Sequence, residues 1–195
     1  MRVIAGEWRR RLLQAPPGEA TRPTADRTRE TLFAMLTSRL GSFEGLAVAD
    51  LFAGSGALGL EALSRGAASC LFAENDPAAL RALRANIANL RAQQRCDVRA
   101  GSVMQLGPAK APCDLILLDP PYGSGAGVVA LDRLARLGWI GEATWIALET
   151  AHDEVVQVRA LAVESERKVG RARLTLLRAS DDRTRSRPTS PAPPR

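Results

Sequence analysis

The sequence predicts an α/β fold: a mostly parallel seven-stranded sheet with helices on both faces and an antiparallel hairpin at one edge. Short apolar runs alternate with helical patterns from Gly45 onward, as in repeated βα units. The runs are almost continuously apolar, which is typical of parallel strands buried on both faces. Near the end of the chain, two strand-like runs are separated by only Gly170, which indicates a hairpin.

The expected elements follow from these patterns in chain order. A helix is expected over 25–40, because apolar residues such as Leu32, Leu36 and Leu40 recur there at helical spacing. Pro77 opens another helix, since proline is tolerated at the first helical position. Alternation over 2–5 suggests a short strand. The remaining strands are expected over 46–52, 69–74, 96–100, 113–119, 144–149, 161–169 and 171–177, and the remaining helices over 56–65, 77–92 and 128–137.

Charge is concentrated at the two ends of this 195-residue chain. The formal net charge is +6, and residues 1–30 hold seven Arg against four acidic residues. We expect a basic N-terminal arm over 1–24, one globular domain over 25–178, and a disordered Pro/Arg-rich tail over 179–195. Basic ends on a nearly neutral body favour a polyanionic partner, most simply nucleic acid. Ordinary solvated surface charge is the open alternative.

Several classes of protein are disfavoured by composition. No apolar run approaches the ~20 residues that span a bilayer, and the first residues lack the apolar core of a secretory signal. Cys70, Cys96 and Cys113 are odd in number and lie in apolar surroundings, so we expect free thiols in a reducing cytoplasm. His152 is the sole histidine, so no structural zinc site is expected.

Four segments are predicted to meet at one edge of the sheet. In open α/β sheets, ligands bind beyond the carboxyl ends of the strands. Those ends are expected at 52–56, 74–76, 101–103 and 119–122. A binding cleft is therefore expected where these four segments converge.

The first of these segments contains a G-x-G-x-x-G pattern, which indicates a nucleotide-type cofactor. Gly54, Gly56 and Gly59 form the pattern, and Glu74 follows Gly54 by twenty residues, where a carboxylate can accept both ribose hydroxyls. That spacing also fits NAD. Asp50 favours S-adenosylmethionine, because a free α-ammonium group attracts a carboxylate and a pyrophosphate does not. The predicted cofactor-binding residues are Asp50, Phe52, Ala53, Gly54, Ser55, Gly56, Gly59, Glu74, Asn75, Ser102, Val103 and Asp119.

The fourth segment, Asp119-Pro120-Pro121-Tyr122, is suited to presenting an amine. An exocyclic base amine is a weak nucleophile, so a catalyst gains by aligning its lone pair with the methyl donor. Asp119 and the carbonyl of Pro120 can each accept one N–H. Pro121 stiffens the backbone, and Tyr122 offers a ring on which a flipped base can stack. This chemistry requires neither a metal nor a histidine base.

Predicted RNA contacts lie near the N-terminus. Arginine binds phosphate in a bidentate manner, and tryptophan can stack on a base. Cations near the start of the helix over 25–40 are disfavoured by its dipole, which hints at a phosphate partner. Trp8 packed onto the core is the alternative. The predicted RNA-binding residues are Trp8, Arg9, Arg10, Arg11, Arg22, Thr24, Arg27 and Arg29.

These motifs together resemble the bacterial 16S rRNA guanine-N2 methyltransferase family. The resemblance rests on the segments 2–9, 21–33, 50–67 and 119–122, and it covers about residues 2–178. It implies a Rossmann-like class I methyltransferase fold and methylation of one guanine N2 in 16S rRNA. It also implies that the substrate is part of the assembling or assembled 30S subunit; we expect a monomer. Arg10 departs from a frequent Gly, and Ser102 from a frequent Asp.

Other functions stay open from the sequence alone. DNA adenine-N6 methyltransferases share the motif at 119–122, although they usually need a target-recognition domain. An NAD-dependent oxidoreductase would use the same glycine pattern, but nothing here resembles its substrate domain. A non-catalytic RNA-binding or assembly factor is the third alternative, since a fold does not fix a function.

Overall fold

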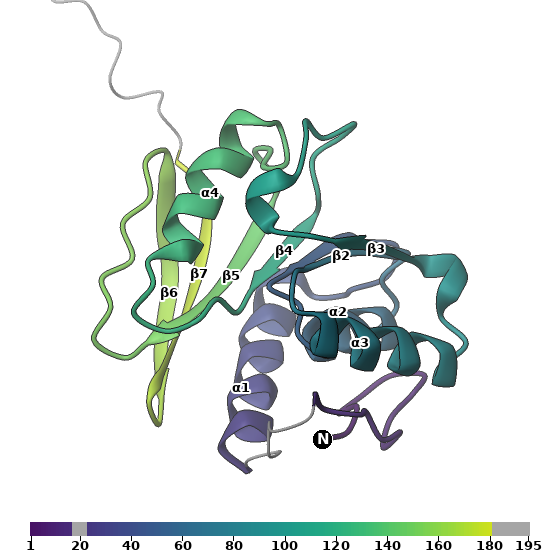
Figure 1. The fold of residues 1–195 in the computed structure, drawn as a ribbon. Coiled ribbons are helices and arrows are strands. Elements are labelled where there is room, and N and C mark those ends of the chain that lie inside the picture. Colours follow the sequence, from purple (N-terminus) through teal and green to yellow (C-terminus); the bar gives the residue numbers. More distant parts are fainter. Residues whose placement is uncertain (17–22, 181–195) are drawn as a thin grey trace, which may run out of the picture.

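A central sheet of seven strands organises the computed structural model, which describes residues 1–16 and 23–180 (Figure 1). Its strands are β1 (Ala47–Leu51), β2 (Ser69–Glu74), β3 (Cys96–Ala100), β4 (Leu115–Leu118), β5 (Trp145–Ala151), β6 (Leu161–Val169) and β7 (Ala172–Ala179). The helices are α1 (Pro23–Leu40), α2 (Ala57–Ser64), α3 (Pro77–Asn89) and α4 (Ala126–Arg136), with short 3₁₀ helices η1 (Gln93–Arg95) and η2 (Val103–Gln105).

The predicted fold class is confirmed by the order of the strands. They run β3-β2-β1-β4-β5-β7-β6, and β7 is antiparallel to both of its neighbours. All other pairs are parallel. The order reverses between β1 and β4, which is the switch point where ligands bind in such sheets.

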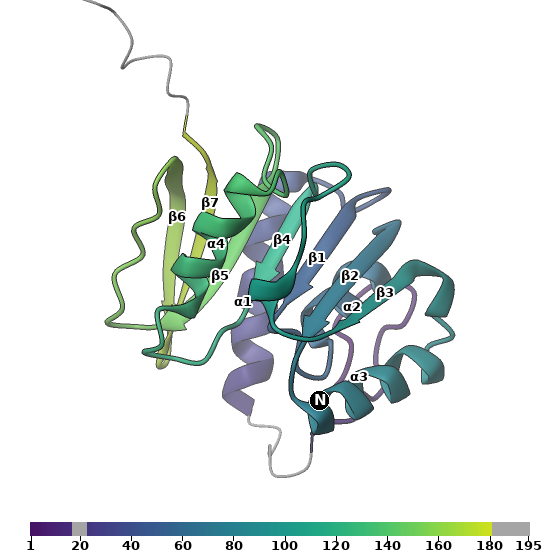
Figure 2. The same ribbon diagram turned by 45° about the horizontal axis from the view of Figure 1, so that its top comes forward.

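Alternating side chains divide the sheet between two hydrophobic clusters. Leu115 and Leu117 pack with residues of α1, α2 and α3 on one face. Ile116 and Leu118 pack with residues of α4 on the other face. Figure 2 shows α4 in front of the sheet and α1 behind it. Helices therefore cover both faces, as the continuous apolar strands predicted.

The predicted strand over 2–5 is absent from the structure, and the bounds of β1, β4, β5 and β7 differ from the predicted ones by one or two residues. Residues 2–5 form no strand, and only an isolated antiparallel bridge joins Arg2 to Leu12. β4 is shorter than the predicted 113–119, and it ends just before the Asp119-Pro120 pair. Pro120 has no N–H with which to continue a ladder, so the strand stops where the polar segment begins.

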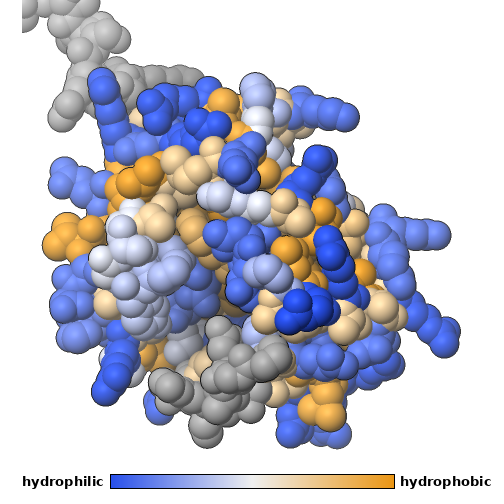
Figure 3. Space-filling model, in the orientation of Figure 1, coloured by the Kyte–Doolittle hydropathy of each residue, from blue (hydrophilic) through white to orange (hydrophobic). Residues whose placement is uncertain are grey.

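Three further features of the described residues concern their surface and their hydrophobicity. Between β3 and β4 the chain forms only η2, and a hollow of about 760 Å³ lies there, lined in part by Leu71, Arg99 and Trp139. In the view of Figure 3, hydrophobic side chains reach the surface in scattered places among hydrophilic ones. Within the described ranges, no helix is long and apolar enough to cross a bilayer.

The three cysteines are free thiols, as predicted. Cys70 and Cys113 are buried, and Cys96 is partly buried. Burial raises the pKa of Cys96 and of Cys113 to about 11. Across residues 1–16 and 23–180, no group of three or more His, Cys, Asp or Glu side chains is placed to hold a metal ion.

Candidate active site

Backbone hydrogen bonds bring the four predicted segments together at the carboxyl edge of the sheet. The Asp119 N–H points to the carbonyl of Leu51 across β4 and β1, at 3.4 Å. The Ala53 N–H donates to the carbonyl of Ala73 at 3.1 Å. On the other side of β2, the Gly101 N–H donates to the carbonyl of Glu74 at 2.8 Å. The expected convergence of the strand ends is therefore observed.

The glycines after β1 serve two different purposes. A Cβ added to Gly59 would lie 2.4 Å from the ring of Phe72, and one added to Gly56 would lie 2.4 Å from Cδ1 of Leu83. Gly59 thus lets α2 pack closely onto β2, and Gly56 lets the start of α2 pack closely against α3. Gly54, at φ +54°, has no neighbouring atom within 4 Å of the point where a Cβ would lie. Its backbone thus faces open space that a ligand could approach.

Asp50 lies beneath this loop as a buried helix anchor. Its Oδ2 accepts the Gly59 N–H at 2.8 Å, which pairs one of the N–H groups at the start of α2. Its Oδ1 is buried and has no hydrogen-bond partner among the described residues. Burial raises the pKa of Asp50 to about 8. The structure thus gives Asp50 a contact that the sequence did not predict, and its predicted contact with a cofactor stays a prediction.

Glu74 is fixed at the end of β2 by three backbone N–H groups. Its Oε2 accepts from Gly54 at 2.7 Å, and its Oε1 accepts from Asn75 and Asp76, each at 2.7 Å. The carboxylate therefore has a set orientation and ties the glycine loop to β2. One further lone pair of Oε2 can still accept a hydrogen bond.

A small hollow of about 20 Å³ unites several residues predicted to bind a cofactor. Its volume holds roughly one water molecule. It is lined by Phe52, Ala73, Glu74, Asn75, Gly101, Ser102 and Val103. Ser102 and Gln105 form a capping box at η2, in which Ser102 Oγ accepts the Met104 N–H at 3.2 Å. Ser102 therefore has a structural role at the position where S-adenosylmethionine enzymes often carry an Asp.

The Asp119–Tyr122 segment is exposed at its polar positions and anchored at Pro120. Pro120 is buried, whereas Asp119, Pro121 and Tyr122 are exposed. Gly127 in α4 leaves room for Pro120, because a Cβ there would lie 3.1 Å from its Cγ. The anchored proline thus positions a carboxylate and a phenol ring at the surface of the site.

Two glutamates that the sequence patterns did not single out brace this segment. The Tyr122 hydroxyl donates to Glu149 Oε1 at 2.6 Å, and the Gly123 N–H donates to Glu154 Oε1 at 2.7 Å. Burial and the hydrogen bond to Glu149 raise the pKa of Tyr122 well above its ordinary value. Glu149 lies in β5, beside β4. Because Glu149 ends the strand predicted over 144–149, the sequence already indicated that it would lie at this edge of the sheet.

The N-terminal segment 1–16 differs from the predicted arm. Trp8 is buried, its backbone N–H donates to Ser64 Oγ at 2.9 Å, and the Arg95 guanidinium lies 4.7 Å from the centre of its ring. The predicted stacking of Trp8 on a base is therefore wrong for this arrangement. The alternative, a tryptophan packed onto the core, is what the structure has.

Arg29 also requires a correction. It is buried and donates to the carbonyl of Arg2, and it pairs with Asp26 at 3.1 Å. Its partner is the chain's own backbone, so it is not placed to contact RNA. Burial lowers the pKa of this guanidinium.

The other predicted RNA contacts are not contradicted. The side chains of Arg9, Arg10, Arg11 and Arg27 are exposed. Arg10 adopts φ +70°, a left-handed conformation that favours glycine. The backbone at this position thus suits the Gly that the resembled family often has there. Arg22 lies outside the described residues, and so does the side chain of Thr24. Of the tail predicted to be disordered over 179–195, Ala179 is the last residue of β7, and residues 181–195 lie outside the described residues.

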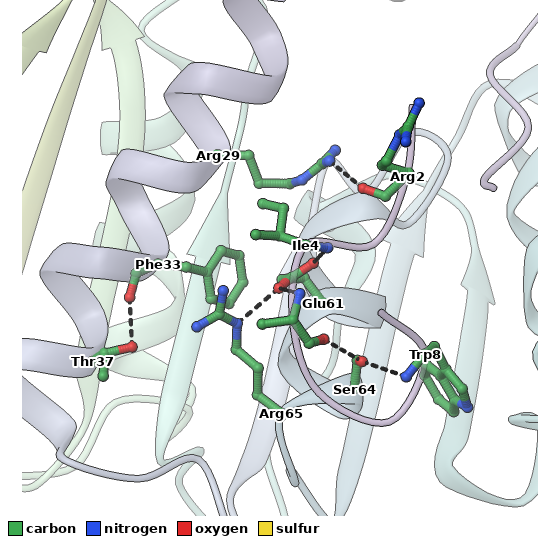
Figure 4. A network of polar contacts seen from close by, with 10 residues as sticks. Arg2, Ile4, Trp8, Arg29, Phe33, Thr37, Glu61, Ser64 and Arg65 are labelled. Atoms are coloured by element: carbon green, nitrogen blue, oxygen red, sulfur yellow. Dashed lines mark hydrogen bonds and ion pairs between the residues drawn. The ribbon is translucent and has the colours of Figure 1, made fainter. Parts of the chain in front are cut away.

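A buried polar network attaches the N-terminal segment to α2 (Figure 4). Glu61 accepts the N–H groups of Ile4 at 2.7 Å and Ala5 at 3.1 Å, and it pairs with Arg65 at 2.8 Å. The Ser64 hydroxyl donates to the carbonyl of Ala5 at 2.6 Å. Polar side chains of one helix therefore replace the strand partners that this segment lacks.

Asn86 of α3 extends the network to the glycine loop. It is fully buried, and its Oδ1 accepts the Gln14 N–H at 2.7 Å. Its Nδ2 donates to the carbonyls of Gln14 at 2.9 Å and Ser55 at 3.0 Å. One side chain thus connects the N-terminal segment to the predicted cofactor loop.

Comparison with known proteins agrees with this geometry. A family model described as Conserved hypothetical protein 95 matches residues 1–178. The chain is 38% identical over 150 residues to the Ribosomal RNA small subunit methyltransferase D of Escherichia coli K12, covering 77% of this chain and 74% of that relative. It is 35% identical over 162 residues to the Putative rRNA methyltransferase YlbH of Bacillus subtilis, covering 81% and 85%. A solved structure described as a putative methyltransferase yhhF from Escherichia coli has a TM-score of 0.80 and 34% identity, over 92% of this chain and 97% of that one.

Proposed function

The chain belongs to the family described as Conserved hypothetical protein 95, and from this premise we propose that it methylates the exocyclic N2 of one guanine in 16S rRNA. The methyl donor in this proposal is S-adenosylmethionine. The curated relatives with 38% and 35% identity are named as rRNA methyltransferases. DNA adenine methylation and NAD-dependent redox chemistry are therefore not favoured.

One observation carries the proposal. The Asp119–Tyr122 segment lies at the same edge of the sheet as the open side of Gly54 and the Glu74 carboxylate, since Asp119 pairs with Leu51 and Glu74 bonds to Gly54. A group that presents an amine and a loop that suits a nucleoside cofactor are thus neighbours. Neither feature alone would specify a methyl transfer.

The residues present fit S-adenosylmethionine. Gly54 leaves its backbone open to a ligand, and Glu74 has a remaining acceptor site for a ribose hydroxyl. Phe52 and Val103 line the adjoining hollow, which holds roughly one water molecule, so an adenine ring would meet these apolar side chains at the mouth of the hollow. When bound, this cofactor supplies an electrophilic methyl group on a sulfonium.

The work of the protein is to orient the base. Asp119 and the carbonyl of Pro120 accept the two N–H groups of the amine, and this directs its lone pair toward the donor. Tyr122, held by Glu149, offers its ring to a base taken out of its stack. Orientation of this kind lowers a barrier by several kcal/mol without a metal.

The exposed arginines at the N-terminal side are proposed to bind the RNA backbone. Arg9, Arg10, Arg11 and Arg27 are exposed residues, and their guanidinium groups suit phosphate oxygens; that of Arg11 also donates to the carbonyl of Asn89 at 2.9 Å. We further place the reaction in the cytoplasm on an assembling or assembled 30S subunit, with a monomeric enzyme.

Mass mapping of 16S rRNA tests the proposal. RNA from cells with and without this protein is digested, and the fragments are weighed. One guanosine should be heavier by the mass of a single methylene group only when the protein is present; identical maps would overturn the proposal. If an adenosine is methylated instead, the protein is still an RNA methyltransferase, but the proposed guanine target is wrong.

A further inference from the structure

Glu149 occupies the position beside Asp119 at the carboxyl edge of the sheet. β4 and β5 are parallel, and the last register pair joins Leu118 to Leu148. The next residue on each strand is acidic: Asp119 on one and Glu149 on the other. Two carboxyl groups thus adjoin where the proposed amine would be held.

The two oxygens of Glu149 have different surroundings. Oε1 accepts the Tyr122 hydroxyl at 2.6 Å. For Oε2, the described part of the chain provides no hydrogen-bond donor, and it is not among the buried unpaired atoms. The side chain is only partly exposed. Glu149 therefore holds the ring of Tyr122 with one oxygen and can accept a further donor with the other.

Glu154 is not equivalent to Glu149. Its Oε1 accepts both the Gly123 N–H at 2.7 Å and the Ala151 N–H at 3.0 Å. These bonds join the loop after Tyr122 to the end of β5, so the main contacts of Glu154 are to backbone. Glu149 is the carboxylate that contacts the aromatic residue of the site.

The purines and pyrimidines that carry amines differ in the atom beside the amine. In guanine the amine-bearing carbon lies between two ring nitrogens: N1, which carries a hydrogen and donates, and N3, which accepts. In adenine and cytosine the ring nitrogen next to the amine is an acceptor. An ionised carboxylate only accepts hydrogen bonds, so it pairs with guanine and repels the lone pair of the other two.

We propose that Glu149 selects guanine by accepting its N1–H while Asp119 and Pro120 hold the adjacent N2 amine. This inference rests on the proposed function and adds to it the residue that reads the base. Sites built to bond an N–H group reject analogues that lack it, because the acceptor is then left unpaired. The Tyr122 contact sets the direction of the Glu149 carboxylate.

A base analogue, compared in two proteins, isolates this contact from the rest of the reaction. 2-Aminopurine keeps the amine at position 2 but lacks both the N1 hydrogen and the O6 carbonyl, so a change of preference on substitution of Glu149, and not the preference itself, reports the N1 contact. Small subunits are reconstituted with 16S rRNA that carries either guanosine or 2-aminopurine riboside at the methylated position. Methyl transfer from radiolabelled S-adenosylmethionine then gives kcat/KM for each RNA, with wild-type protein and with Glu149→Gln.

Wild-type protein should prefer guanosine by about 10- to 100-fold, which is the range for a hydrogen bond to a charged group. Glu149→Gln should reduce this preference at least about tenfold, because its amide can donate to the unprotonated N1. The exposed Glu164→Gln on β6 carries the same change away from the site and should leave the preference intact.

Each outcome is informative. An equal preference in wild type and Glu149→Gln overturns the role of Glu149, even if the variant is slower overall, because a merely structural role changes both RNAs alike. No transfer to guanosine by the wild-type protein overturns the proposed function instead. If Glu149→Gln does not fold, Glu149→Asp, which keeps the acceptor, should retain the preference for guanosine, and its loss contradicts the proposal.

Discussion

The N-terminal segment 1–16 and the Asp119–Tyr122 segment are both polar, and they use their polar groups in opposite ways. In the first, Glu61, Ser64 and Asn86 pair with backbone N–H and C=O groups. In the second, the side chains of Asp119 and Tyr122 are exposed at the edge of the sheet. The first arrangement fixes a segment in place, and the second presents acceptors to a substrate.

The difference shows why charge and aromaticity near a terminus are weak signals of binding. Trp8 and Arg29 looked available in the sequence but are buried against the chain itself. Buried polar groups almost always have partners, and these partners lie far away in sequence. Substitutions in the two segments should therefore separate stability from catalysis.

The largest expected effect is on catalysis. Asp119→Ala should lower kcat by about 10³-fold, because the amine loses an acceptor that orients it. Cofactor affinity and the unfolding midpoint should change little, since this side chain is exposed. Methylation kinetics, calorimetric titration and thermal unfolding measure these three quantities in turn. Asp153→Ala, also exposed, is the control, and retained turnover in Asp119→Ala would contradict the proposed role.

The opposite pattern is expected in the N-terminal network. Glu61→Ala should lower the free energy of unfolding by about 3 kcal/mol, because two N–H groups and Arg65 lose a buried partner. Urea denaturation measures this loss, and exposed Glu44→Ala should cost far less. The kcat of methyl transfer by the folded variant should stay within about threefold of wild type. A much larger loss of kcat would contradict the idea that the N-terminal segment contributes to stability and not to catalysis.

Glu74 lies between these extremes, because it both braces a loop and faces the site. Glu74→Ala should weaken S-adenosylmethionine binding by about 10- to 100-fold, the cost of lost hydrogen bonds to a charged group. Calorimetric titration below the unfolding temperature separates affinity from stability. An unchanged dissociation constant would remove Glu74 from the cofactor site and leave it a purely structural residue.

The smallest effect should come from the exposed arginines. Replacing Arg9, Arg10 and Arg11 by Ala should make the negative slope of log K against log salt for RNA binding shallower by about 2, because each phosphate contact contributes about 0.7 to 0.9 to its magnitude. Replacing three exposed cations elsewhere, Arg159, Arg167 and Lys168, is the matched control. Equal slopes in both triple variants would mean that the N-terminal segment is ordinary surface.

Local patterns explain what the sequence predicted correctly. The spacing of Gly54, Gly56 and Gly59 is set by a strand-to-helix turn within one βα unit, so it could be read directly. The apolar runs gave β2, β3 and β6 with their observed bounds. The convergence of the four strand ends followed from a general rule about parallel sheets.

Long-range partners explain what the sequence did not predict. The burial of Trp8 depends on Ser64, 56 residues away, and the burial of Arg29 depends on a carbonyl 27 residues away. The separate roles of the glycines depend on Phe72 and Leu83, which pattern alone does not place. Glu149 could have been noticed at the end of its strand, but its bond to Tyr122 requires the sheet order.

The contacts of Ser64, Asn86 and Arg95 also determine when the N-terminal segment of the nascent chain can fold. Residues 1–16 are synthesised before the groups that hold them, which come 56, 72 and 88 residues later at Ser64, Asn86 and Arg95. At about 5–20 residues per second, this leaves a wait of about 3–18 s. During that interval Val3, Trp8 and Leu13 have no core to enter. The part of the chain that is made first thus takes its place only after the chain has been made as far as Arg95.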